Sequence, residues 1–162
     1  MYSELYRNAI KAENEVIKAF INENKPLHWC YGSYTDAANN QYDCITEGHV
    51  LIAFGFNTFA LSKEKFEINN RVLNNMSQLI DKESLSYEPA QLIGTRLVED
   101  GKKYNCCVLK KESTGEEILF NEKYKKYFTD DVEYKVTDSK SPIKIYNGNV
   151  FMGVIMPVMV KE

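Results

Sequence analysis

The hydrophobic and polar positions of this chain predict an opening helix. Between Ser3 and Asn24 the apolar residues recur at about 100° per residue, and Ser3 is placed to cap the first turn. The apolar side consists of Leu5, Tyr6, Ala9, Ile10, Val16, Ile17, Phe20 and Ile21. We expect this side to face the core. Glu13 falls in its middle, so it has either a buried partner or a place in a subunit contact.

Strand-like segments follow once Pro26 stops the helix. Residues rich in aromatic and β-branched types, bounded by turn residues, are typical of strands. We expect strands over Leu27 to Tyr34, Tyr42 to Thr46 and His49 to Phe56, with turns at Asn39-Asn40 and Glu47-Gly48.

The middle of the chain predicts a helix from Ser62 to about Ile80 and a hairpin from Gln91 to Lys111. The hairpin turns at Glu99-Asp100-Gly101. The last part predicts a strand Glu117 to Phe120, a short helix Asn121 to Phe128, strands from Val132 and over Ile143 to Tyr146, an Asn-Gly turn, and a final apolar strand.

Two stretches resemble the bacterial sliding clamp, the DNA polymerase III beta subunit. In the last third, the order of helix, hairpin and apolar strand is similar to the closing half of a clamp domain. The matching residues are Asn121, Tyr124, Thr137, Asp138, Ser141, Pro142, Ile143, Met156 and Pro157. Near the start, Thr46, Gly48 and His49 resemble a second clamp hairpin, with Glu47 where that family usually has Asp.

The resemblance implies an α+β fold, a single DNA-clamp-like domain over residues 1–162. Two half-repeats, each a helix followed by antiparallel strands, would span about residues 1–61 and 112–162. An inserted helix and hairpin would occupy about residues 62–111, and this departs from ordinary clamp domains. We expect the insertion to provide a surface for a partner.

Composition limits the kind of partner. The chain has 162 residues, 44% of them hydrophobic, and a net charge of -3. Such a chain is long enough for one adequate core, and its acidic balance argues against general adhesion to nucleic acid. Any DNA contact would have to come from a local patch.

The most basic patch is a stripe along the first helix. Arg7, Lys11, Lys18 and Lys25 line up at steps of four and seven. The resemblance implies that clamp helices face the DNA, and Lys123, Lys125 and Lys126 of the second helix would join this stripe. The alternative is an ordinary solvated helix face, because Glu4 and Glu15 border the stripe closely.

The sequence gives little support for a catalytic or metal-binding site. Cys44 and His49 are conceivable as a nucleophile and its base, and His28, Cys30, Cys44 and His49 as a zinc set. The spacings match no standard zinc motif, and cysteines in strands are commonly core residues. No phosphate-binding glycine motif is present. We expect no enzyme and no cofactor.

The cysteines and the length of the apolar runs indicate where in the cell the protein is located. Four cysteines, two of them adjacent, do not form a secreted disulfide framework. No apolar run approaches the roughly 20 residues of a membrane span. We expect a soluble cytoplasmic protein that does not contact membranes.

Two functional hypotheses remain. The first is a non-catalytic clamp-like binding protein of DNA replication or DNA metabolism, carried by a phage or mobile element, that contacts duplex DNA or replication proteins. The second is a clamp-mimicking interaction or inhibitor module that does not bind DNA. A clamp ring contains six such domains, so one domain would have to form a homo-oligomer to encircle DNA.

Overall fold

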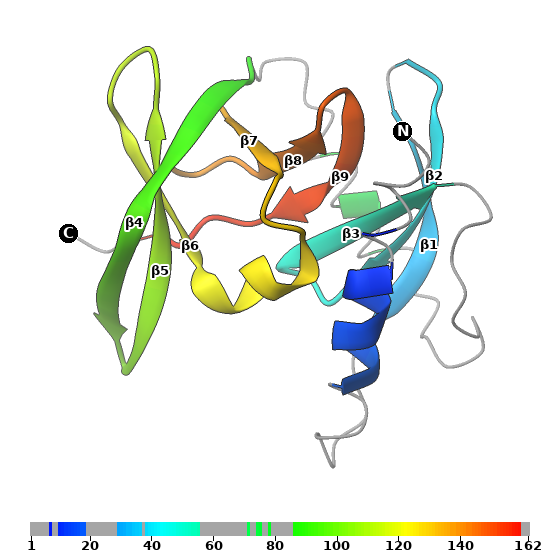
Figure 1. The fold of residues 1–162 in the computed structure, drawn as a ribbon, viewed down its shortest axis with the longest axis horizontal. Helices are drawn as coiled ribbons and strands as arrows, with labels where there is room; N and C mark the ends of the chain where they lie inside the picture. The colour runs from blue at the N-terminus through cyan, green and yellow to red at the C-terminus, as the bar shows by residue number, and fades with distance from the viewer. Residues whose placement is uncertain are drawn as a thin grey trace.

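Nine strands form a single antiparallel sheet that dominates the structure (Figure 1). The computed structural model describes residues 7, 10–18, 29–36, 38–55, 71, 74–75, 78 and 86–159. The strands are β1 (Cys30–Thr35), β2 (Gln41–Thr46), β3 (Val50–Gly55), β4 (Glu88–Asp100), β5 (Lys102–Lys111), β6 (Glu117–Asn121), β7 (Glu133–Val136), β8 (Ile143–Asn147) and β9 (Val150–Ile155). Their order in the sheet is β1-β2-β3-β9-β8-β7-β4-β5-β6. The expected combination of helices with antiparallel strands is therefore confirmed at this coarse level.

Three groups of three strands build the sheet. Strands β1 to β3 and strands β7 to β9 are meanders in which each strand pairs with the next along the chain. The two meanders join through their last strands, with Val50, Leu51 and Ile52 of β3 opposite Ile155, Val154 and Gly153 of β9. Strands β4 to β6 attach to β7 through Glu88–Ala90. The hairpin predicted between positions 91 and 111 is thus part of the same sheet.

Side chains alternate between the two faces of the sheet along each strand. The main core lies on one of these faces. In β3, Val50, Ile52 and Phe54 enter the main core, whereas Leu51 and Ala53 belong to a cluster on the opposite face. In β5, Cys107 and Leu109 enter the main core, whereas Cys106 and Val108 pack with Val98 and Leu119 in a third cluster.

Helical segments cover the main core face. The segment 10–18 contributes Ala12 and Val16, and the short helix η2 (Glu122–Tyr127) contributes Tyr124 and Tyr127. The Asn121 side chain caps η2 by accepting a hydrogen bond from the Lys123 N–H at 3.1 Å. The helix predicted from Asn121 to Phe128 is therefore confirmed in position, and it is a 3₁₀ helix.

The orientation of the first helix differs from the prediction. Ile10 and Ile17, expected in the core, are 47% and 37% exposed, whereas Ala12 and Val16 are fully buried. The sheet face beneath is crowded with large rings, so the helix approaches it through smaller side chains. Glu13 lies beside them and is buried, as expected from its place in the pattern.

Most strand predictions are confirmed to within a few residues. The Asn39-Asn40 turn contains Asn39 at φ 67°, and the Asp100-Gly101 turn contains Gly101 at φ 70°. Strand β4 begins at Glu88, three residues before the predicted start. Of the helix predicted from Ser62 to Ile80, the described residues 71, 74, 75 and 78 are helical, and the rest lies outside the described residues.

Gly153 stands at the junction of the two meanders. A Cβ atom there would lie 2.2 Å from the Leu51 carbonyl oxygen and 3.0 Å from the Phe128 ring. Phe128 follows η2 directly and is fully buried. The missing side chain of Gly153 thus allows β3, β9 and the end of η2 to meet at one place.

We expect Gly153→Ala to lower the free energy of unfolding by roughly 2–4 kcal/mol, since it adds both a collision and a backbone penalty. Gly94→Ala is the matched control, because Gly94 has the same φ of 153° but nothing within 4 Å of the methyl group that alanine would add. Urea denaturation measures both. Equal losses would show that backbone conformation alone matters at Gly153.

Candidate nucleic-acid interface

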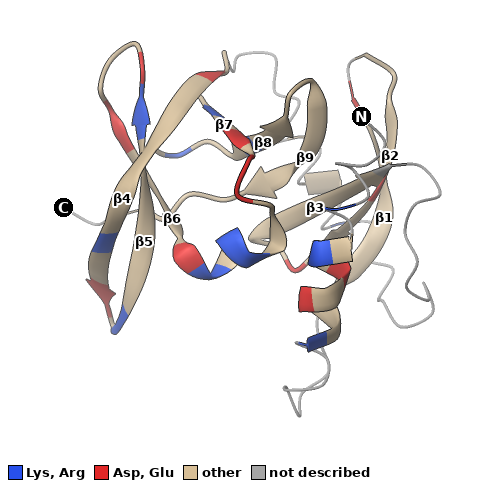
Figure 2. Cartoon of the chain, in the orientation of Figure 1, with Lys and Arg blue, Asp and Glu red and all other residues tan. Residues whose placement is uncertain are grey.

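The basic residues of the first helix lie on its exposed side, beside the end of η2. Arg7, Lys11 and Lys18 line a shallow hollow of about 480 Å³ together with Ile10 and Thr129, among others. Acidic groups accompany these cations. Glu15 accepts a 3.1 Å hydrogen bond from Lys18, and the same helix carries both blue and red segments in Figure 2. This hollow therefore carries less positive potential than the stripe of basic residues predicts.

A further carboxylate lies near Arg7. The pKa of Asp131 is held below its usual range by a hydrogen bond with the Thr129 hydroxyl, by one with Asn147, and by the charge of Arg7. Arg7 and Asp131 are far apart in the chain, so the first helix and the loop after η2 lie near each other here. Lys25, the last residue of the predicted stripe, lies outside the described residues.

The three lysines of η2 do not form one patch. The Lys126 ammonium lies 5.1 Å from the centre of the Tyr127 ring, and the Lys123 ammonium lies 5.0 Å from the centre of the Tyr124 ring. Lys125 lines a cleft of about 560 Å³ that also contains Glu112, Asp130, Glu133 and Lys135. With three carboxylates and two ammonium groups, this cleft does not favour a polyanion.

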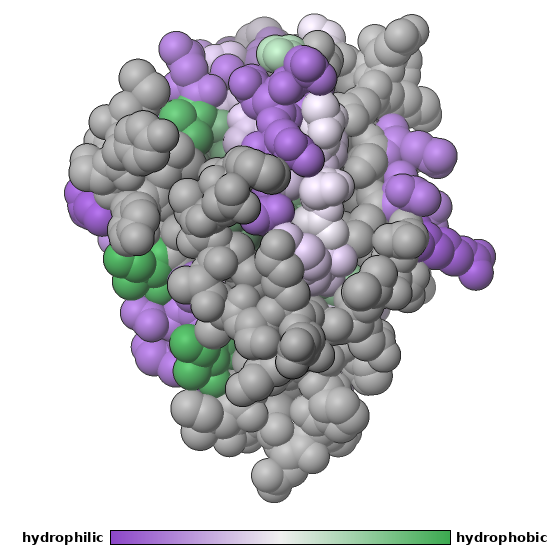
Figure 3. All heavy atoms as spheres, turned by 90° about the vertical axis from the view of Figure 1, so that its right-hand side faces the viewer, coloured by the Kyte–Doolittle hydropathy of each residue, from purple (hydrophilic) through white to green (hydrophobic). Residues whose placement is uncertain are grey.

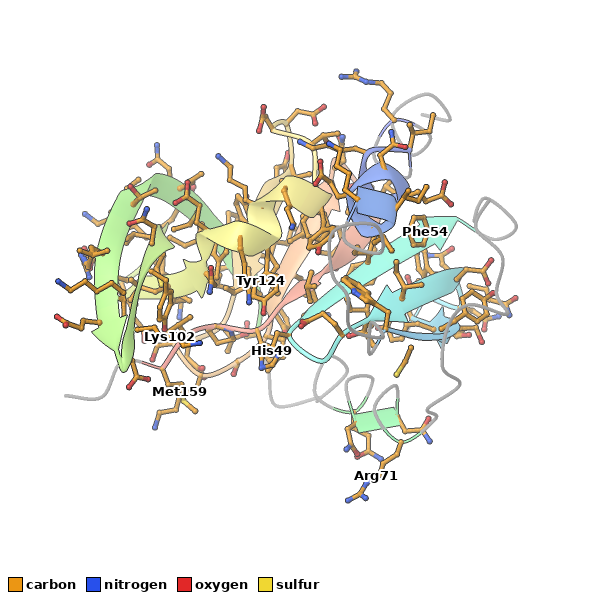
Figure 4. The ribbon with its side chains drawn as sticks, turned by 90° about the horizontal axis from the view of Figure 1, so that it is seen from below. His49, Phe54, Arg71, Lys102, Tyr124 and Met159 are labelled. Carbon is orange, nitrogen blue, oxygen red and sulfur yellow. The ribbon has the colours of Figure 1, made fainter. Side chains whose placement is uncertain are left out.

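Lys123 instead joins two lysines that sequence analysis did not select. Lys102 and Lys103 at the start of β5 line a hollow of about 530 Å³ with Lys123, Tyr104, Asn105, Asn121 and Glu122. We call this hollow the hairpin notch. Figure 4 shows Lys102 near the tip of the β4–β5 hairpin, and Tyr124 on η2. A lysine pair at a hairpin tip is common, so only the approach of η2 distinguishes it.

Both stretches that resemble the clamp family form turns held by side-chain hydrogen bonds. The Thr46 hydroxyl donates to the Val50 carbonyl at 2.8 Å and accepts from the Gly48 N–H at 3.0 Å. Glu47 accepts from the N–H groups of His49 and Val50 at 2.7 and 3.0 Å. A glutamate therefore caps this turn where the clamp family has aspartate.

The second turn works in the same way. Asp138 accepts hydrogen bonds from the N–H groups of Lys140 and Ser141, both at 2.8 Å. The neighbouring Thr137 hydroxyl donates to the Ser86 carbonyl at 3.1 Å. These residues order the backbone of the turn.

The cysteines and histidines considered for chemistry lie in different environments. Cys44 is fully buried in the cluster on the opposite face, and Cys30 is buried in β1. The His49 side chain is 69% exposed, stacks on Tyr124 at 6.4 Å between ring centres, and has its Nδ1 3.5 Å from Glu47. His28 lies outside the described residues. Within the described part of the chain, no three His, Cys, Asp or Glu residues are grouped to hold a metal ion.

None of the helices that the structure describes is both long and apolar enough to span a membrane.

Comparisons with protein-family models, curated proteins and solved structures give no match to this chain.

We expect Cys44, Cys106 and Cys107 to react slowly with iodoacetamide in the folded protein. Burial raises the pKa of each thiol, so little thiolate is present at about pH 8. Labelling followed by mass spectrometry should be at least about tenfold slower than in guanidinium chloride, the unfolded control. Rapid labelling of Cys44 in the folded protein would revive a nucleophilic role for it.

Proposed function

We propose that this chain is a non-catalytic, sliding-clamp-like binding protein of DNA replication or DNA metabolism. The proposal rests on the order of the elements, in which a helical segment precedes each of two meanders. Residues 10–18 precede the β1–β3 meander, and η2 precedes the β7–β9 meander. The last strands of the two meanders pair antiparallel, so the units are arranged head to head about the β3–β9 junction. This arrangement supports two half-repeats.

The position of the helices supports a binding surface. Both helical segments lie on the same face of the sheet, because their buried residues share one core cluster. Their outer side carries Arg7, Lys11 and Lys18 on the first helix and the exposed Lys126 on η2. We call this side the helical surface and propose that it contacts duplex DNA or a replication protein.

A protein partner is the second candidate, in which the chain mimics a clamp without binding DNA. Two observations favour it. Lys18 is already paired with Glu15, and the exposed Ile10 and Ile17 lie on the same side of the helix. Exposed isoleucines suit an apolar contact better than a phosphate backbone. In Figure 3 apolar side chains likewise interrupt the hydrophilic surface along one side.

Light scattering with and without short duplex DNA, at about 50 mM salt, tests the first candidate. We expect a closed homo-oligomer that retains duplex, and weaker retention after charge reversal of Arg7, Lys11 and Lys18 to glutamate. Reversal of Lys110, Lys140 and Lys144 gives the same change in net charge elsewhere. A monomer or dimer that ignores duplex would support the protein-contact candidate instead.

A further inference from the structure

The second half of β4 has one open side. Strand β4 runs from Glu88 to Asp100, and β5 pairs with it along nearly all of that length. On its other side β7 pairs with residues 88–90 alone. Residues 94–100, which we call the β4 edge, therefore have only one neighbouring strand in the described sheet. Figure 1 shows this half of β4, in green, at one flank of the molecule.

The hydrogen-bond pattern indicates which backbone groups of the β4 edge face outward. The Lys111 N–H donates to the Glu116 carbonyl at 2.8 Å, so Lys111 of β5 faces the side of β6. Orientation alternates along a strand, so the even-numbered residues of β5 face β4. The even-numbered residues of the β4 edge lie opposite them. The odd-numbered residues Thr95, Leu97 and Glu99 therefore turn their N–H and C=O groups to the open side.

Exposed apolar side chains accompany these backbone groups. Leu97 is 62% exposed, and Ile93, at the bulge before the β4 edge, is 48% exposed. On the other face of the strand Val98 is buried with Cys106 and Leu119, so that face already has its contacts. A strand edge that combines free backbone groups with a large exposed apolar side chain pairs readily with another strand.

The β4 edge is complementary to a second copy of itself. Its middle residue is Leu97, whose backbone groups face outward. A twofold axis at this residue places Leu97 opposite Leu97 of the second copy, and Thr95 opposite Glu99. All outward-facing residues of one copy then meet outward-facing residues of the other, and each such pair exchanges two hydrogen bonds. A twofold contact of this kind closes at two copies.

Charges agree with this register. Glu99 faces Thr95 rather than another carboxylate, and Arg96 lies diagonal to Asp100 of the second copy. Moving the axis by one residue toward the N-terminus sets Arg96 opposite itself. Moving it by one residue toward the C-terminus sets Leu97 opposite Glu99. Only the axis at Leu97 packs this exposed side chain against another apolar one.

The length of the open stretch also fits a second copy. With the axis at Leu97, the turn residue Gly101 of one copy comes opposite Ile93 of the other. Strand β7 begins at Glu133, and its register with β4, continued by one residue, places Glu133 opposite Gln91. The hairpin of the second copy therefore ends before it would meet β7.

We propose that the β4 edge is a homodimer interface, in which the β4 strands of two copies pair antiparallel about a twofold axis at Leu97. The occupant is a second copy because the edge matches itself in hydrogen-bond orientation, charge and length. The pairing buries the two Leu97 side chains against each other and joins the sheets of the two copies. This inference goes beyond the proposed function, since β4 lies outside both helix-and-meander units and the pairing requires neither DNA nor the helical surface.

Sedimentation velocity at protein concentrations from about 1 to 300 μM tests the proposal on the full chain. We expect the unaltered protein to show a monomer–dimer equilibrium. Leu97→Lys and Leu97→Glu should each weaken dimerisation roughly tenfold, because the apolar contact is lost and like charges face each other across the axis. An equimolar mixture of these two variants should form a mixed dimer, because opposite charges then meet at the axis.

Met159→Lys and Met159→Glu are the matched controls. Met159 is 65% exposed, which is close to the exposure of Leu97, and it lies outside β4. We expect dimerisation of these two variants to equal that of the unaltered protein. Urea denaturation confirms that each variant folds.

An unaltered protein that stays monomeric over this range would overturn the proposal and leave the β4 edge to an extended peptide of another protein. Equal losses in the Leu97 and Met159 variants would also overturn it, as would a lysine–glutamate mixture that stays monomeric. Tighter dimerisation of Leu97→Lys alone would place the axis at Val98 and so contradict the proposed register. Loss of duplex retention after charge reversal on the helical surface, with the dimer intact, would count against the proposed function alone.

Discussion

The short pairing between β3 and β9 is the constraint on which the rest of the structure depends. Only three residues of each strand face each other, yet they connect two meanders that are otherwise separate in sequence. The Met156 N–H extends this junction by donating to the His49 carbonyl at 2.8 Å. Because Phe128 packs against the same place, the sheet and η2 are held in register together. The positions of Lys123 and Tyr124 follow from this contact.

Charge is distributed over this surface as separate small sites. The helical surface combines cations with Glu15 and Asp131, and the cleft around Lys125 contains more carboxylates than ammonium groups. The hairpin notch is lined by three lysines and Glu122, and Glu99 and Asp100 of β4 lie opposite Lys103 and Lys102. Sites of mixed charge such as these act on a charged ligand only at short range, since screening at physiological salt acts over about 8 Å. The net charge therefore says little about each site.

Local sequence signals predicted the turns and strands well because their causes are local. Thr46, Glu47 and Asp138 act on backbone groups within four residues, so their effect is visible in sequence. The face of the first helix was predicted only in part, since Val16 is buried as expected but Ile10 and Ile17 are exposed. Its apolar arc is wide, and the neighbouring rings decide which part is buried. The notch could not be predicted, since Lys102 and Lys123 meet only where β6 ends and η2 begins. Such juxtapositions depend on strand register.

The hydrogen bond from Val158 to Leu119 also determines how this sheet can grow. It occupies the middle carbonyl of β6, one of the two outer strands in the described sheet, so another chain cannot extend the sheet there without displacing this segment. The opposite outer strand, β1, has no such cover from the described residues. At the β6 edge, a second copy would have to break the hydrogen bond from Val158 to Leu119 before any strand could add.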